Sequence, residues 1–295
     1  MRIFVKQPLC IHELGKRQNQ EDSVFPPDGG ASIDDRLFMV CDGMGGHEHG
    51  EVASQLVCGV LSACVKEHFD GNVLTDDMLH DALDEVFRQI NQLDDGTVKR
   101  MGTTLTLLCL HHGGATMAHI GDSRIYHIRP RERRILYKSR DHSLVYDLFM
   151  AGEIKQEEMA TYSKKNVITR AVMPGLERQP KADNVHSTDI LPGDIFILCS
   201  DGMLEQMSDS ALVDLLTKGM ADEEIRQRLI EVTKDNKDNH SAWLVSIDRV
   251  ESETGDESLL HDEDKARCNA LLWEKQPTVT RNEPSFWEKV KSLFN

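Results

Sequence analysis

The chain has 295 residues and a formal net charge of −16 at pH 7, with a pI near 5.2. This excess of carboxylates argues against a nucleic-acid-binding protein, which would present a basic surface. The length is enough for one large domain or two small ones with a sizeable buried core. The beginning of the sequence lacks a signal-peptide pattern, and no apolar run approaches the length of a membrane span.

The seven cysteines are scattered along the sequence, and none of them forms a Cys-x-x-Cys pair. Such usage is typical of buried, reduced thiols and not of a disulfide framework or a zinc site. We therefore expect a cytoplasmic protein without a transmembrane segment, and one that does not take nucleic acid as a partner.

The predicted elements alternate between strands and helices. Residues 1–25 contain short extended pieces, and Pro26-Pro-Asp-Gly-Gly30 indicates a turn or loop. Thr75 suits the N-cap of the second helix, and Asp222 is expected to cap the last one. Apolar residues at helical spacing predict helices over 51–69, 75–93, 208–218 and 222–232. Runs rich in β-forming residues predict strands over 37–41, 102–110, 115–120, 125–128, 134–137, 166–172, 183–190, 194–199 and 241–247.

The first candidate site residue is Asp42, at the end of a short apolar run. The run Leu37–Cys41 has the length and composition of a buried strand, and a glycine-rich segment follows Asp42 before the helical pattern begins. A carboxylate in this position is costly unless a cation or a hydrogen-bond donor compensates it. The alternative is an ordinary Asp-Gly turn between a strand and a helix.

The same pattern occurs a second time at 194–203. There the sequence again runs from an apolar strand through a cysteine to an Asp-Gly-Met, with Asp201 as the carboxylate. Two buried strands that end in Asp42 and Asp201 can bring both carboxylates to one end of a sheet. Because hard divalent cations are held by clustered carboxylates and carbonyl oxygens, Asp42 and Asp201 are predicted to be metal ligands.

The adjacent His111 and His112 are a weaker metal candidate. They stand beside Gly113 and Gly114, which indicate a turn between two strands. We expect the two histidines to lie on an exposed turn and not to bind a metal.

The composition changes near residue 251. Residues 1–250 have the pattern of a folded domain, whereas 251–284 are acidic and polar, as in a linker. In the terminal segment 285–295, apolar side chains fall on one helical face, with two large aromatics beside it. This amphipathic segment either packs on the domain as a terminal helix or docks on a partner protein.

Six motifs, in order, resemble those of the metal-dependent protein phosphatases of type 2C over about residues 10–250. One Asp-Gly-x-Gly-Gly motif would be weak, but six in the family's order are specific. Met44 and the Asp141-His-Ser segment look like the bacterial branch. The motifs are Arg17-Gln-Asn-Gln-Glu-Asp22, Val40-Cys-Asp-Gly-Met-Gly-Gly-His47, Met101-Gly-Thr-Thr104, His119-Ile-Gly-Asp-Ser-Arg124, Ser200-Asp-Gly202 and Lys237-Asp-Asn239.

The resemblance implies an α+β fold, a four-layer α-β-β-α sandwich in which helices flank two central antiparallel sheets. It also implies two ions of Mn²⁺ or Mg²⁺ at one end of the sandwich, with a weaker third ion beside them. Such oxygen-only ligation suits these hard cations. By motif position, Asp42 would bridge the two metals, and Asp201 and Asp238 would complete the ligands of one of them. The Gly43 carbonyl and the Glu21/Asp22 pair would serve the other metal, partly through water. Asp122 with Asp201 would hold the third ion.

The activity implied by the resemblance is hydrolysis of phosphoserine and phosphothreonine by direct attack of a metal-bridging hydroxide. Two divalent ions about 3.5–4 Å apart lower the pKa of such a water and steady an in-line displacement. Arg17 matches the family arginine that binds the substrate phosphate through paired hydrogen bonds. We expect the enzyme to act on phosphorylated proteins and to oppose a bacterial serine/threonine kinase. The alternative is a phosphatase-like binding module that acts through its C-terminal tail.

The sequence departs from the family pattern at the proton donor. Met44 stands where eukaryotic members place a histidine that is a favoured general acid. His47 is the nearest substitute and is predicted to be the catalytic acid, with a metal-bound water as the alternative donor. The segment between Asp141 and Val167 falls where the family carries a mobile flap that influences substrate choice.

Overall fold

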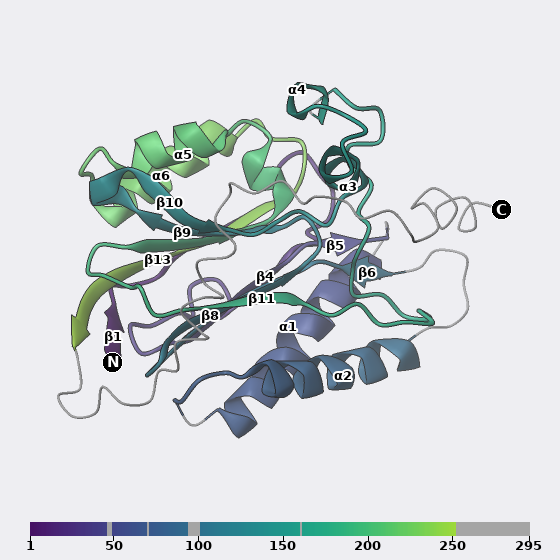
Figure 1. Ribbon diagram of the computed structural model, residues 1–295, viewed down its shortest axis with the longest axis horizontal. Helices are drawn as coiled ribbons and strands as arrows, with labels where there is room; N and C mark the ends of the chain where they lie inside the picture. Colours follow the sequence, from purple (N-terminus) through teal and green to yellow (C-terminus); the bar gives the residue numbers. More distant parts are fainter. Residues whose placement is uncertain (46–48, 70, 94–100, 160, 252–295) are drawn as a thin grey trace. The chain divides into compact units, whose positions relative to one another are not determined.

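The computed structural model describes residues 1–45, 49–69, 71–93, 101–159 and 161–251 (Figure 1). His47 and the two C-terminal segments, 251–284 beyond its first residue and 285–295, lie outside these ranges. The predictions made for them therefore stay predictions.

The first sheet has six antiparallel strands in the order β1-β13-β12-β9-β10, with β2 paired to another part of β13. It brings together the two ends of the described chain, because β1 pairs with the last strand. The strands are β1 (Arg2–Val5), β2 (Leu9–Glu13), β9 (Arg124–Arg129), β10 (Arg134–Lys138), β12 (Ile195–Cys199) and β13 (His240–Glu251).

The second sheet has five antiparallel strands in the order β11-β8-β7-β4-β3, and a separate two-stranded ladder joins β5 to β6. The strands are β3 (Ser23–Phe25), β4 (Leu37–Cys41), β7 (Leu105–His111), β8 (Gly114–Ile120) and β11 (Asp183–Ser187), with β5 (Gly43–Met44) and β6 (Gly102–Thr103) in the ladder.

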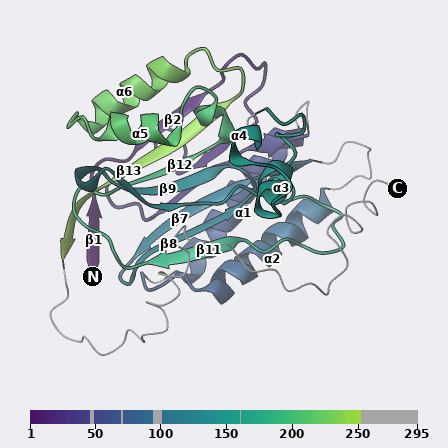
Figure 2. The same cartoon turned by 45° about the horizontal axis from the view of Figure 1, so that its top comes forward.

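Helices cover the outer face of each sheet. The second sheet is covered by α1 (His49–His68) and α2 (Asp76–Gln92), and the first by α5 (Asp209–Leu216) and α6 (Asp222–Thr233) (Figures 1 and 2). Two short helices, α3 (Leu144–Met150) and α4 (Gln156–Met159), follow β10. Single 3₁₀ turns occupy Pro130–Glu132 and Asp201–Leu204. The predicted order of layers, helices outside and two antiparallel sheets inside, is confirmed.

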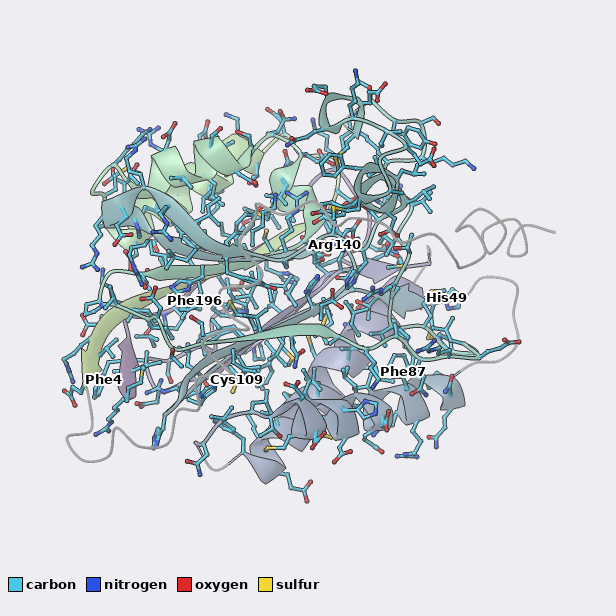
Figure 3. All side chains as sticks on the ribbon, viewed as in Figure 1. Phe4, His49, Phe87, Cys109, Arg140 and Phe196 are labelled. Atoms are coloured by element: carbon cyan, nitrogen blue, oxygen red, sulfur yellow. The ribbon has the colours of Figure 1, made fainter. Side chains whose placement is uncertain are left out.

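The strand β4 shows why the central runs are apolar on both faces. Its residues are all buried: Leu37, Met39 and Cys41 pack in the layer with α1 and α2, while Phe38 and Val40 pack between the two sheets. A strand with packed elements on both sides reads as a continuous apolar run, because neither face meets water. Figure 3 labels residues of both core layers. Phe87 of α2 and Cys109 of β7 pack between the helices and the second sheet, and Phe196 of β12 packs between the two sheets.

The structure corrects two element predictions. Residues 166–172 do not form a strand, because only isolated bridges hold this segment, from Ser143 to Ile168 and from Thr103 to Val172. Each bridge partner comes from a different part of the chain, so no continuous ladder can form. The last helix is capped by Ala221, and Asp222 is its first helical residue, where its charge still favours the helix N-terminus.

The exposed-turn prediction for the paired histidines was half wrong. His111 is buried, with its Nε2 3.0 Å from Thr116 Oγ1 and its Nδ1 accepting from the Gly113 amide, while His112 is exposed. Burial, with the neighbouring His186 and His112, lowers the pKa of His111 to about 4. Five of the six cysteines of the described ranges are buried, and no disulfide joins two of these six. Within those ranges, no helix is long and apolar enough to cross a lipid bilayer.

Candidate active site

The acidic residues picked out from the sequence gather where the ends of several strands meet. Asp42 directly follows β4, and Asp201 lies two residues after β12. The other carboxylates stand before β3, between β8 and β9, and before β13; they are Asp22, Asp122 and Asp238. The charges of these three and of Asp201 all act on Asp42, so the fold brings together five acids that are up to 216 positions apart in sequence.

Burial and mutual repulsion together raise the pKa values of Asp22, Asp42, Asp122 and Asp201. Burial and then the charges of Asp22 and Asp201 raise the pKa of Asp42 well above its usual value. Burial and the charge of Asp201 raise the pKa of Asp122 to about 7. Desolvation and the charge of Asp238 raise the pKa of Asp201. Carboxyls with raised pKa values in one place are typical of a site that is completed by cations.

Asp22 occupies the most enclosed position of the cluster. It is 3% exposed, its Oδ2 accepts a hydrogen bond of 2.8 Å from Ser200 Oγ, and its Oδ1 is buried with no hydrogen-bond partner. Burial raises its pKa to about 7, although hydrogen bonds from Ser241 and Ser200 oppose the rise. Asp122 Oδ1 is likewise buried and without a partner. Two orphaned carboxylate oxygens in an all-oxygen cluster fit hard divalent cations.

Both Asp-Gly motifs need their glycine because backbone packs directly against it. A Cβ on Gly43 would lie 2.3 Å from the carbonyl oxygen of Gly50 and 2.4 Å from that of Glu21. A Cβ on Gly202 would lie 2.0 Å from the carbonyl oxygen of Asn239. These contacts let the segment after each aspartate turn closely into the site, which explains why the pattern occurs twice.

Arg17 is the cation that the structure places against the acidic cluster. Its Nη2 donates a hydrogen bond of 2.7 Å to Asp238 Oδ2, and its side chain is 51% exposed. The hydrogen bond to Asp238 raises the pKa of the guanidinium. A half-exposed guanidinium at the rim of an acidic cluster is positioned to meet an incoming phosphate.

Asn239 and Ser200 were not assigned a role from the sequence, yet they hold the site together. The Asn239 side chain accepts from the Glu21 amide at 2.9 Å and donates to the Leu14 and Asn19 carbonyls. It thereby ties the Arg17–Asp22 segment to the start of β13. Both residues stand inside motifs already noted, directly beside a predicted ligand, and that adjacency was the available signal.

A second cluster, His119, His142 and Asp183, has ligand atoms within 4.8 Å of one another. The two imidazole rings are stacked, with centroids 4.6 Å apart and an interplanar angle of 13°, so their in-plane lone pairs run side by side and do not converge. Arg170 Nη1 already donates to Asp183 Oδ1 at 2.7 Å. This cluster is therefore an ion-paired support of the segment after β10, and not a metal centre.

The comparisons with known proteins agree with this geometry. The family model described as protein phosphatase 2C matches residues 15–245. The chain belongs to the protein phosphatase 2C family. The protein phosphatase PhpP of Streptococcus pneumoniae is 33% identical to it over 221 residues, which cover 74% of this chain and 88% of PhpP. This membership makes the chain a serine/threonine protein phosphatase of a metal-dependent family.

Solved structures of the family share the fold. The serine/threonine phosphatase PstP of Mycobacterium tuberculosis superimposes with a TM-score of 0.71 at 28% identity, covering 84% of this chain and all (100%) of that one. The catalytic domain of PstP in complex with two manganese ions gives a TM-score of 0.68 at 29% identity, with coverage of 84% and 100%. A relative of this phosphatase 2C chain therefore binds two manganese ions.

Proposed function

We propose that this phosphatase removes phosphate from serine and threonine side chains of proteins in a site built from Arg17, Glu21, Asp22, Asp42, Gly43, Asp122, Asp201 and Asp238. The observation that carries the proposal is the convergence of five carboxylates with one arginine at the rim. Without cations, such an arrangement is strongly destabilising. It is reasonable only if the acids exist to hold positive charge.

The proposed role of each ligand follows from its position in the family motifs. Asp42, central among the acids, would be shared by two Mn²⁺ or Mg²⁺ ions, with Asp201 and Asp238 completing one of them. Asp22, Glu21 and the Gly43 carbonyl would serve the other ion, partly through water, and Asp122 with Asp201 would hold a third. When bound, such ions supply Lewis-acid activation of water and of the phosphoryl group.

The chain's own groups perform the remaining steps. Arg17 binds the phosphate oxygens of the substrate and holds the phosphorus facing the cluster, because a guanidinium offers paired donors in a fixed plane. Protonation of the leaving serine or threonine oxygen is assigned to His47, with a water of the site as the alternative donor. The two cysteines nearest the cluster in sequence take no part, since burial raises the pKa values of Cys41 and Cys199 and keeps both as thiols.

The proposed substrates are phosphorylated proteins in the cytoplasm, where the enzyme would oppose a serine/threonine kinase. The names of the relatives as serine/threonine phosphatases and the buried cysteines support this assignment. Residues 1–250 would form the catalytic domain and 251–284 an acidic linker. The segment 285–295 would serve as a docking segment for a partner.

The test is hydrolysis of a phosphothreonine peptide by purified protein. We expect turnover with Mn²⁺, none after chelation, and recovery when Mn²⁺ is restored. Asp42→Asn should remove the recovery. The matched control is Asp214→Asn, an exposed carboxylate of α5 that pairs with Arg133 and is not among the proposed ligands. Full Mn²⁺-dependent activity in Asp42→Asn would show that the assignment of the site is wrong.

A further inference from the structure

Two buried hydroxyl groups connect the backbone of Asp42 to the segment that carries Asp122. Thr104 Oγ1 accepts a hydrogen bond of 2.9 Å from the Asp42 amide and shares one of 2.7 Å with Ser123 Oγ. Thr104 and Ser123 are both fully buried (0% exposed). Thr104 directly precedes β7 of the second sheet, and Ser123 lies directly after Asp122 on the connection from β8 of that sheet to β9 of the first.

Thr103 and Thr104 hydrogen-bond to both the amide and the carbonyl group of Asp42. The carbonyl oxygen of Asp42 accepts from the Thr104 amide at 2.9 Å and from Thr103 Oγ1 at 2.9 Å. With the bond from its own amide to Thr104 Oγ1, both polar groups of the Asp42 backbone are held by two consecutive threonines. A buried amide that lost this acceptor would have no water to replace it.

The segment that leads to Ser123 also packs against Thr104. Gly121 has a φ of +109°, and a Cβ on it would lie 2.6 Å from Thr104 Cγ2. The segment before Asp122 therefore packs directly on the threonine side chain. The hydroxyl group of Thr104 is the polar link between this segment and the backbone of Asp42.

We propose that Thr104 and Ser123 are positioning residues, which set the spacing between Asp42 and Asp122 so that each carboxylate is held where it can bind the cations of the cluster. The inference rests on the proposed function, because it takes these two acids as ligands. The physical reason is that cation affinity depends on holding mutually repelling carboxylates in place before the ion arrives. A hydroxyl pair does this without adding charge to the site.

The chain contains a matched control two residues further along the same strand pair. Thr106 Oγ1 accepts from the Val40 amide at 3.3 Å and donates to the Val40 carbonyl at 2.8 Å. Thr106 is as buried as Thr104, and it also clamps a residue of the β4 segment, but that residue has no carboxylate. Loss of this hydroxyl should affect stability alone.

The experiment measures Mn²⁺ binding to the metal-free full-length protein by isothermal titration calorimetry, with thermal unfolding in parallel. We expect Thr104→Val and Ser123→Ala to weaken Mn²⁺ binding by about 10–100-fold, the usual effect of removing a group that orients a ligand. Thr104→Ser, which keeps the hydroxyl, should bind as the wild type does. Thr106→Val should lower the Tm but leave Mn²⁺ affinity unchanged.

Either of two results would overturn the inference: wild-type Mn²⁺ affinity in Thr104→Val, or an equal loss in Thr106→Val. Should Thr104→Val fail to fold, Ser123→Ala decides, because it removes the bridge while leaving the Asp42 amide its acceptor; unchanged affinity there overturns the inference too. Asp42→Asn separates the two proposals. If it binds Mn²⁺ normally, the proposed metal site fails, whereas loss in Asp42→Asn with none in Thr104→Val refutes only the positioning role.

Discussion

The two ends of β12 carry the same residue type in opposite circumstances. Asp194, just before the strand, is fully buried and receives two hydrogen bonds of 2.9 Å from Arg129, one of 2.9 Å from the Leu191 amide and one of 3.0 Å with His127. Burial raises the pKa of Asp194, but the bonds from His127 and Arg129 outweigh it and lower the pKa to about 2.

Asp201, just after the strand, faces other acids in place of partners. Its pKa is raised by desolvation and by the charge of Asp238, and none of the ion pairs among the described residues includes Asp201. Desolvation raises the pKa of both carboxyls, although Asp194 is fully buried and Asp201 is exposed, so desolvation does not separate a structural carboxylate from a functional one. The presence or absence of a compensating cation in the protein does.

The largest effect that tests the contrast between Asp194 and Asp201 is expected from Asp201→Asn. Removal of the charge should lower kcat at saturating Mn²⁺ by at least about 100-fold, because the ion then lacks a charged ligand. The same change should raise the Tm of the metal-free protein, since it relieves repulsion. Steady-state kinetics and thermal unfolding in chelator measure the two effects. A variant with full activity, or with a lower metal-free Tm, contradicts the contrast drawn here.

At the other end, Arg129→Met should leave Asp194 buried without its main partner. We expect a loss of about 3–5 kcal/mol in the free energy of unfolding, the usual result of breaking a buried ion pair. Turnover per folded molecule should stay unchanged. Urea unfolding provides the measurement, and Arg133→Met, which disrupts an exposed pair, should cost less than about 1 kcal/mol. Equal losses in both variants would argue against a structural role for the buried pair.

The pH dependence of stability should differ between metal-free and loaded protein. The pKa values of Asp22 and Asp122 are raised to about 7, so the folded state binds protons more tightly than the unfolded state, in which an aspartate titrates near pH 3.9. Stability of the metal-free protein should thus decline as the pH rises from about 4 to about 7. Asp194 contributes oppositely, since its lowered pKa gives stability that is lost as the pH falls from about 4 towards 2.

Thermal unfolding across pH 4–8 checks this expectation. In chelator, the Tm should fall by several degrees between pH 5 and pH 8. With Mn²⁺ the decline should disappear, because bound cations stabilise the ionised carboxylates. A metal-free Tm that rises through this window would mean that the acids are compensated within the protein.

The smallest expected effect is that of Arg17→Lys. A lysine keeps the charge but loses the planar pair of donors, so we expect KM for a phosphothreonine peptide to rise about tenfold with a smaller change in kcat. Lys16→Arg is the control, because Lys16 is a neighbouring exposed cation that pairs with Asp235. An unchanged KM in Arg17→Lys would place phosphate binding on another group.

Much of the fold could be predicted because its signals are local. The apolar run of β4 indicated a strand buried on both faces, and Thr75 caps α2 as expected, its side chain accepting from the Met78 amide. The predicted strand at 166–172 failed for a non-local reason. Its β-forming residues meet only single bridge partners from separate segments, and no sequence window contains that information.

The candidate site, like the fold, could be predicted from the sequence only in part. The sequence by itself predicted the chemical type of the candidate ligands, because a carboxylate followed by glycine at the end of a buried strand is a local pattern that occurs twice. Only the tertiary structure decided which acids meet, which stay compensated, and which hydroxyls hold them. Asp194 and Asp201 flank one strand and differ in the charges that surround them, and Thr104 differs from Thr106 in the residue that lies opposite. The physical reason is that the energy of a buried charge depends on its neighbours in space, which come from remote parts of the chain.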